Sequence, residues 1–152
     1  MELQTYDIKQ NKRSRSFQFI SIGPKGSIQK LVIYQETAIP NLFNLAFGDL
    51  NHNTKELDDL AVSDNGDGEK VLATVVSTVH RFFKDNQESI VYLTGSTPSR
   101  TRIYRIAISK YLPVFENKYE ILGELPTDWE RFKPDKEYEG FFIKLKLDGS
   151  KS

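Results

Sequence analysis

The 152-residue chain contains no cysteine, and this absence excludes several kinds of protein at once. Without cysteine there are no disulfides, no thiolate metal sites and no cysteine nucleophile. The chain also lacks a run of about 20 apolar residues, which a membrane-crossing helix needs, and its N-terminus lacks the apolar centre of a signal peptide. We therefore expect a cytoplasmic protein that does not contact a membrane.

Net charge is the second quantity that the chain lacks. Its 21 basic and 21 acidic residues cancel, so no overall field attracts nucleic acid or an anionic membrane. The charges are nonetheless segregated: six basic residues and no acidic one lie in 9–30, seven acidic residues and one lysine in 49–69, and five basic residues and one glutamate in 100–118. The simplest interpretation is that these are solvated faces that attract each other.

The length predicts a single domain over residues 1–148, followed by a flexible tail at 149–152. Strand patterns dominate its first half. The alternating residues 16–23 and the β-branched and aromatic run 27–39 predict two strands, and the GPKG sequence between them predicts a tight turn. Further strands are predicted at 41–50 and 56–63, with a weaker pattern at 3–9.

The spacing of apolar residues changes after this first half. Valines, leucines and phenylalanines recur three and four residues apart from Val71 to Phe83, which predicts a helix over 69–86 with Asp67 as its N-cap. A compact strand is predicted at 89–95. Proline at a first helical position predicts a second helix that begins at Pro98, has Thr97 as its N-cap and ends before Pro113.

Two closing strands are predicted at 119–125 and 138–147, around a loop at 126–136. The order of elements indicates an α+β fold: a mostly antiparallel, curved sheet with a strand-rich first half, and two main helices packed on one face.

Five aromatic residues of the first-half strands could lie on either face of that sheet, because the register of the strands is open. On an exposed face beside lysines they would form a platform on which single-stranded bases stack. Against the helices they would be core residues, which is the commoner arrangement. They are Phe17, Phe19, Tyr34, Phe43 and Phe47.

The stretch YLTGSTPSRTRIYR, residues 92–105, carries the strongest indication of a binding site. A strand that ends near Gly95 and turns into a helix at Pro98 places unpaired backbone N–H groups and a positive dipole end beside hydroxyl groups. Arg100 in the first helical turn is unfavourable there unless an anion compensates it. Arg102 and Arg105 share a helix face, so phosphate is the ligand that this pattern favours. The alternative is an ordinary capped helix whose arginines pair with the acidic residues at 56–67.

Other catalytic and metal-binding patterns are absent from the sequence. The stretch matches neither a P-loop nor a GxGxxG turn, and DNGDGE at 64–69 lacks the alternating ligands of a calcium loop. No serine lies in a nucleophile elbow. We expect no catalytic residue, no metal and no cofactor.

The motifs FGD at 47–49, NGD at 65–67 followed by KVLATV, and GSTPSRTRIYR at 95–105 resemble a family of small bacterial proteins known only as a domain of unknown function. This resemblance implies a bacterial, cytoplasmic protein of one domain, and it implies no activity. The order of strands and helix also looks like the single-stranded-DNA-binding folds of the Whirly and transcriptional-coactivator type, a likeness of topology alone.

Three functional hypotheses follow from these patterns. The first is a single-stranded nucleic-acid-binding module. The second is a non-enzymatic protein-interaction or regulatory module that uses its opposite charges to bind a protein partner or a second copy of itself. The third is a phosphate-binding enzyme or sensor centred on residues 94–105. The residues expected to contact phosphate are Lys12, Arg13, Arg15, Lys25, Lys30, Ser96, Thr97, Ser99, Arg100, Arg102 and Arg105.

Overall fold

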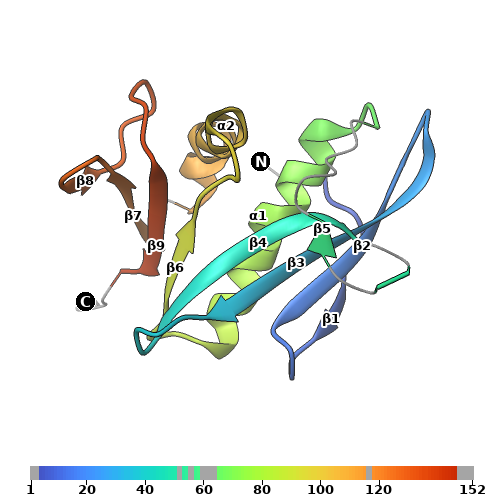
Figure 1. The fold of residues 1–152 in the computed structure, drawn as a ribbon, viewed down its shortest axis with the longest axis horizontal. Coiled ribbons are helices and arrows are strands. Elements are labelled where there is room, and N and C mark those ends of the chain that lie inside the picture. The colour runs from blue at the N-terminus through green and yellow to red at the C-terminus, as the bar shows by residue number, and fades with distance from the viewer. Residues whose placement is uncertain (1–3, 51–52, 55–56, 59–64, 116–117, 147–152) are drawn as a thin grey trace. The chain divides into compact units, whose positions relative to one another are not determined.

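The computed structural model describes residues 4–50, 53–54, 57–58, 65–115 and 118–146 (Figure 1). The chain forms two compact units: unit 1 contains residues 1–35 and 45–82, and unit 2 contains residues 36–44 and 83–152. Antiparallel strand pairs predominate and the described residues form two helices, so the predicted α+β class is confirmed. No helix in the described ranges has the length and apolar content to cross a membrane. The predicted tail lies outside the described residues.

Unit 1 is built on a long antiparallel hairpin. Its turn consists of Pro24 and Lys25, which join the paired residues Gly23 and Gly26. Gly26, directly after the turn, has a positive φ of 92°, which glycine adopts without strain. The predicted strand at 16–23 is therefore confirmed, and the strand predicted at 27–39 is found at Gly26–Glu36. The strands of this unit are β1 (Lys9–Asn11), β2 (Ser16–Gly23), β3 (Gly26–Glu36), β4 (Leu42–Leu50) and β5 (Leu57–Asp58), in the order β1-β2-β3-β4 with β5 on β4.

Two strands of unit 1 differ from the prediction. The weak pattern at 3–9 predicted a strand that instead occupies Lys9–Asn11, where it pairs with the start of β2. In the predicted strand 56–63 only Leu57 and Asp58 are paired, opposite Leu50 and Asp49, and residues 56 and 59–63 lie outside the described residues.

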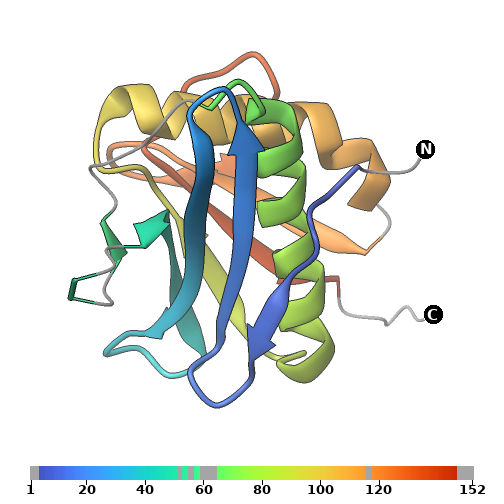
Figure 2. The same ribbon diagram turned by 90° about the vertical axis from the view of Figure 1, so that its right-hand side faces the viewer.

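Helix α1 (Gly68–Asp85) runs alongside β2 and β3 (Figure 2). The ring of Tyr34 on β3 stacks on Phe82 at 4.3 Å between centroids, and its hydroxyl shares a 2.7 Å hydrogen bond with that of Thr78. Thr78 and Phe82 lie one helical turn apart, so both contacts fall on one side of α1. The predicted apolar helix face is therefore confirmed as a packing face.

Asp67 occupies the predicted N-cap position of α1, because its carbonyl accepts the first helical hydrogen bond from Val71. Its carboxylate, however, accepts hydrogen bonds from the hydroxyls of Tyr6 at 2.5 Å and Ser21 at 2.6 Å. Burial would raise the pKa of Asp67, but the hydrogen bonds from Ser21 and Tyr6 outweigh it and hold this pKa below its usual value. The carboxylate therefore ties the N-terminal segment and β2 to the start of the helix.

The five aromatic residues of the first-half strands are all buried, which contradicts their use as a stacking platform. Phe17 and Tyr34 are each about 1 % exposed, and Phe17 meets Tyr34 edge to face. Phe19 stacks on Phe47, and Phe43 is buried as well. These rings fill the core because they lie on the strand positions that alternate toward the inside.

Lys30 lies on the same inward face of β3 and is 2 % exposed. Its Nζ atom is 2.5 Å from Oδ1 of Asp49 on β4, so the cation is held in a buried ion pair. A buried lysine cannot contact a phosphate on the surface, and Lys30 therefore leaves the set of expected phosphate contacts.

Four strands and the second helix lie in the described part of unit 2. The strands are β6 (Ile90–Leu93), β7 (Tyr119–Glu124), β8 (Trp129–Arg131) and β9 (Gly140–Leu145), in the order β6-β9-β7-β8 with every pair antiparallel, and the helix is α2 (Pro98–Phe115).

Two details of unit 2 correct the prediction. The helix continues through Pro113 to Phe115, because the φ angle of proline is itself helical and its ring disturbs only the preceding turn. Strand β8 lies inside the predicted loop, since three residues are too few to show an alternating pattern.

We predict that the protein tolerates replacement of both Lys30 and Asp49 but is destabilised when Lys30 alone is replaced. The Lys30→Met variant leaves the Asp49 carboxylate buried without this cation, and we expect its free energy of unfolding to fall by about 3 kcal/mol. The double variant Lys30→Met with Asp49→Leu should regain most of this loss. Urea unfolding followed by circular dichroism measures both, and a double variant as unstable as Lys30→Met would contradict the prediction.

Candidate functional site

The turn between β6 and α2 is closed so tightly that only glycine fits at residue 95. A Cβ atom on Gly95 would lie 2.5 Å from the Cβ of Arg100 and 2.5 Å from the backbone nitrogen of Thr101. The N–H of Gly95 donates a 3.0 Å hydrogen bond to the hydroxyl of Thr101, which is buried. The turn is therefore bound to the first turn of the helix that follows it.

Thr97 caps this helix as predicted. Its hydroxyl oxygen accepts a 3.2 Å hydrogen bond from the N–H of Arg100, and its carbonyl accepts the N–H of Thr101 at 3.0 Å. Ser96 and Ser99, on either side of the cap, are exposed. The positive end of the helix dipole is thus surrounded by hydroxyl groups that water or a ligand can reach.

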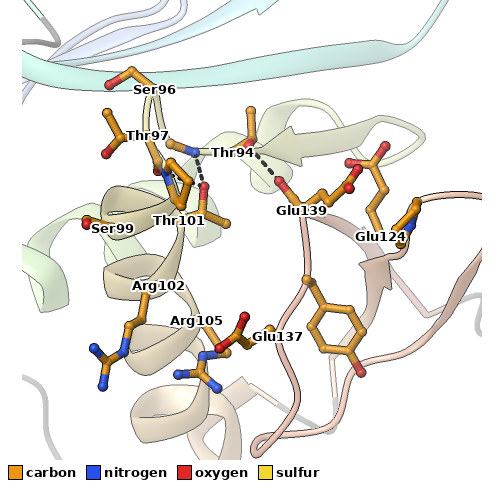
Figure 3. A pocket seen from close by; sticks show the side chains of 14 residues that line it. Thr94, Ser96, Thr97, Ser99, Thr101, Arg102, Arg105, Glu124, Glu137 and Glu139 are labelled. Carbon is orange, nitrogen blue, oxygen red and sulfur yellow. Dashed lines mark hydrogen bonds between the residues drawn. The ribbon is translucent and has the colours of Figure 1, made fainter.

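A hollow of about 630 Å³ opens beside this turn, and all of its lining belongs to unit 2 (Figure 3). One wall is the start of α2 and the turn before it. The other wall is the end of β7 and the segment that leads into β9. The lining residues are Thr94, Gly95, Ser96, Thr97, Pro98, Ser99, Thr101, Arg102 and Arg105 on the first wall, and Glu124, Pro126, Glu137, Tyr138 and Glu139 on the second.

Two arginines extend the first wall along the helix. Arg102 and Arg105 lie about one turn apart and both line the hollow (Figure 3). Neither forms an ion pair with any residue that the structure describes. Arg100 differs from them: its guanidinium lies 3.4 Å from the hydroxyl of Tyr104 and is not part of the lining.

The second wall contributes three carboxylates to the hollow, and one of them is firmly positioned. The Glu124 carboxylate accepts a 2.5 Å hydrogen bond from the hydroxyl of Tyr92. Burial, together with this bond, raises the pKa of Tyr92 to about 12, so the tyrosine remains a donor at neutral pH. Gly140 leaves the necessary space, because a Cβ there would lie 2.6 Å from the Tyr92 hydroxyl and 2.9 Å from Oε1 of Glu124.

Tyr138 lies between the other two glutamates in the sequence and lines the hollow with them. Its buried ring covers Gly123, where a Cβ would lie 2.3 Å from the ring. Its hydroxyl donates to Glu130 at 2.7 Å, while neighbouring Glu139 accepts the Thr94 hydroxyl at its carbonyl, also at 2.7 Å. Glu137 and Glu139, on either side of Tyr138 in the chain, line the hollow as well.

The structure brings together five of the predicted phosphate contacts in one hollow. Ser96, Thr97, Ser99, Arg102 and Arg105 all line the hollow.

The basic residues of unit 1 do not form one cluster. Lys12, Arg13 and Arg15 occupy the turn before β2, whereas Lys25 occupies the turn after it. The eight residues of β2 separate the two turns by about 25 Å at ~3.3 Å per residue. Because Lys30 is also buried, the basic residues of 9–30 do not form a continuous basic track on the surface.

Sequence reasoning missed the three glutamates of the hollow. They lie 9 to 24 residues beyond the end of α2 in the chain, and no spacing relates them to it. Among the described residues, no group of three histidine, aspartate or glutamate side chains is arranged to hold a metal ion. The hollow therefore offers hydrogen bonds and charges of both signs.

The comparisons with known proteins identify a family and no activity. Residues 2–146 match the model of a family of unknown function, DUF6934, and the chain belongs to this family. No curated protein and no solved structure matches it. The predicted family resemblance is thus confirmed, whereas the likeness to Whirly and coactivator folds, the bacterial source and the cytoplasmic location stay predictions.

We predict that the Thr97 hydroxyl stabilises the start of α2. Thr97→Ala removes the acceptor for the N–H of Arg100, and we expect the free energy of unfolding to fall by about 1 kcal/mol. Thr97→Ser keeps the acceptor and is the matched control. Urea unfolding of the three proteins measures the difference, and equal losses in both variants would show that the methyl group, not the cap, matters.

Proposed function

We propose that this member of the family binds a small phosphate-bearing ligand in the hollow beside α2. The observation that carries the proposal is the pair Arg102 and Arg105, which line the hollow without an ion pair to a described residue. Guanidinium groups bind phosphate through paired N–H donors more strongly than neutral donors do.

The phosphate would bind where the hydroxyl groups and the helix dipole act together. Ser96 and Ser99 are exposed beside the capped end of α2, and their hydroxyls donate hydrogen bonds to phosphate oxygens. Arg102 lies one turn along the helix from Ser99, within reach of the same anion. A cation beside a helix N-terminus is unfavourable, and a bound phosphate removes this conflict.

The carboxylate wall restricts what the rest of the ligand can be. Glu124, Glu137 and Glu139 would repel a second phosphate, and they accept hydrogen bonds from hydroxyl or amino groups. A volume of about 630 Å³ falls in the range of small-molecule sites. These properties favour a ligand with one phosphate end and one hydroxyl-rich or amino end, such as a nucleoside monophosphate or a sugar phosphate.

Of the three hypotheses drawn from the sequence, this proposal corresponds to the sensor form of the third. We propose binding and assign no catalytic step, because the Glu124 carboxylate is occupied by Tyr92 and neither Glu137 nor Glu139 carries a hydrogen-bonded base or nucleophile in the described structure.

Thermal unfolding in the presence of inorganic phosphate, nucleoside monophosphates and sugar phosphates tests the proposal. A ligand that binds only the folded protein raises its melting temperature by mass action. We expect Arg102→Ala with Arg105→Ala to weaken the best ligand at least about tenfold in calorimetry, since one charged hydrogen bond contributes about 1.5 kcal/mol or more. Lys110→Ala, on the same helix but outside the lining, is the matched control.

Two further results discriminate between the walls of the hollow. Glu137→Gln should leave inorganic phosphate binding intact or stronger and should weaken a ligand that uses the carboxylate wall. Absence of any melting shift across the panel, or equal binding by the double arginine variant, would contradict the proposal.

A further inference from the structure

The sheet of unit 2 has one face that its strand register turns away from the buried core. Val91, Leu93, Phe141 and Ile143 are buried on the inner face. The intervening positions form the other face, on which Tyr92 of β6 and Leu122 of β7 both pair with Phe142 of β9. We call this outward face the open face.

Three aromatic rings form a row across the open face. Phe142 lies between two others: its ring centroid is 4.9 Å from that of Tyr92 and 5.3 Å from that of Trp129 on β8. Tyr92 and Phe142 are half-buried, whereas Trp129 is 58 % exposed. Tryptophan is usually covered in folded proteins, so one standing at the end of an aromatic row indicates a surface that contacts something else.

Basic residues border this row. Lys144 lies on the open face of β9, and the hydrogen bond from Lys146 N–H to the Lys118 carbonyl at 2.9 Å extends the β7–β9 ladder by one more pair on that face. Arg131 pairs with Leu122 and so lies on the open face of β8. All of these cations are exposed or half-exposed.

The acidic residues of the open face are already engaged. Glu124 holds the Tyr92 hydroxyl, and Glu120 pairs with Lys144 at 3.6 Å. Both members of the Glu120–Lys144 pair are more than a third exposed, so the pair is weak and readily exchanged for another anion. The face thus presents aromatic rings with a net positive border.

We propose that the open face binds single-stranded nucleic acid, with bases stacked on Trp129, Phe142 and Tyr92 and phosphates along the flanking cations. Aromatic rings on a sheet accept bases of any sequence, and the bases must be unpaired to reach them. A second copy of the chain is disfavoured as the occupant, because two positive borders would then face each other. This binding does not depend on the ligand of the hollow. The two sites share only Glu124, whose carboxylate accepts the Tyr92 hydroxyl.

This surface is the type of platform that the sequence suggested, built from other residues. The predicted aromatic residues are core; all but Phe43 belong to unit 1. The aromatic residues of the open face lie in unit 2. Their strands carry aromatic residues at adjacent positions, such as Phe141 and Phe142, so the sequence does not indicate which ring faces outward.

The protein carries its own probe for the test, because Trp129 is its single tryptophan. Titration with single-stranded RNA and DNA of about ten nucleotides, the size range of such sites, should quench tryptophan emission as a base stacks on the indole. Anisotropy of the labelled strand should give the same affinity, and this affinity should fall steeply as salt rises.

Matched variants separate stacking from charge and from the hollow. Trp129→Leu should weaken the anisotropy-measured affinity about tenfold, whereas Trp129→Phe, which keeps a ring, should stay within about threefold of the parent. Arg131→Ala should reduce the salt dependence. Arg102→Ala with Arg105→Ala should leave this binding unchanged, so failure here is distinguishable from failure of the small-ligand proposal.

Several outcomes would overturn the inference. These are the absence of quenching at low salt, unchanged affinity in Trp129→Leu, and equally strong binding of duplex. A change of tryptophan emission with protein concentration alone would identify a second copy as the occupant. Circular dichroism of Trp129→Leu confirms that the variant is folded, as expected for an exposed side chain.

Discussion

The close approach of Gly95 to the first turn of α2 is the constraint on which the rest of unit 2 depends. With no side chain at this position, the chain leaves β6 and enters the helix within four residues, and Thr101 can bond the turn that precedes it. The same closeness brings the start of α2 to the hollow, which the end of β7 and the segment before β9 line with carboxylates. A wider turn would separate the two walls of the hollow, and their opposite charges would then act on separate surfaces.

Local features of the site could be predicted from the sequence, because each is decided within a few residues. Thr97 and Pro98 specify where α2 begins, and the spacing of Arg102 and Arg105 puts them on one side of a helix. The carboxylate wall could not be predicted, since Glu124 and Glu137 reach the hollow only through the pairing of β7 with β9. Sequence patterns show only the spacing of residues along the chain, whereas this wall forms through the pairing of strands in the sheet.

The buried and exposed aromatic residues could not be told apart from the sequence either, because their positions depend on strand register. A shift of one residue moves every side chain of a strand to its other face, so a run such as Phe141-Phe142 indicates a strand without indicating which ring is buried. Pairing resolves this: Phe141 fills the core and Phe142 turns outward. Lys30 is the opposite case, since a lysine read as surface charge is internal and neutralised by Asp49.

The Asn65 side chain, which lies in unit 1, couples the β2–β3 hairpin to the chemical ageing of the protein. Its amide accepts the N–H of Lys25 at 2.7 Å and donates to the carbonyl of Gly26 at 2.9 Å, and it precedes Gly66. Asparagine before glycine is prone to deamidation, in which the next backbone nitrogen attacks the side-chain carbonyl. While both hydrogen bonds hold, the amide is kept from that attack. Each local opening of the hairpin exposes the Asn65 amide to this attack. Deamidation would replace the amide by a carboxylate, which would repel the Gly26 carbonyl and prevent the turn from closing again.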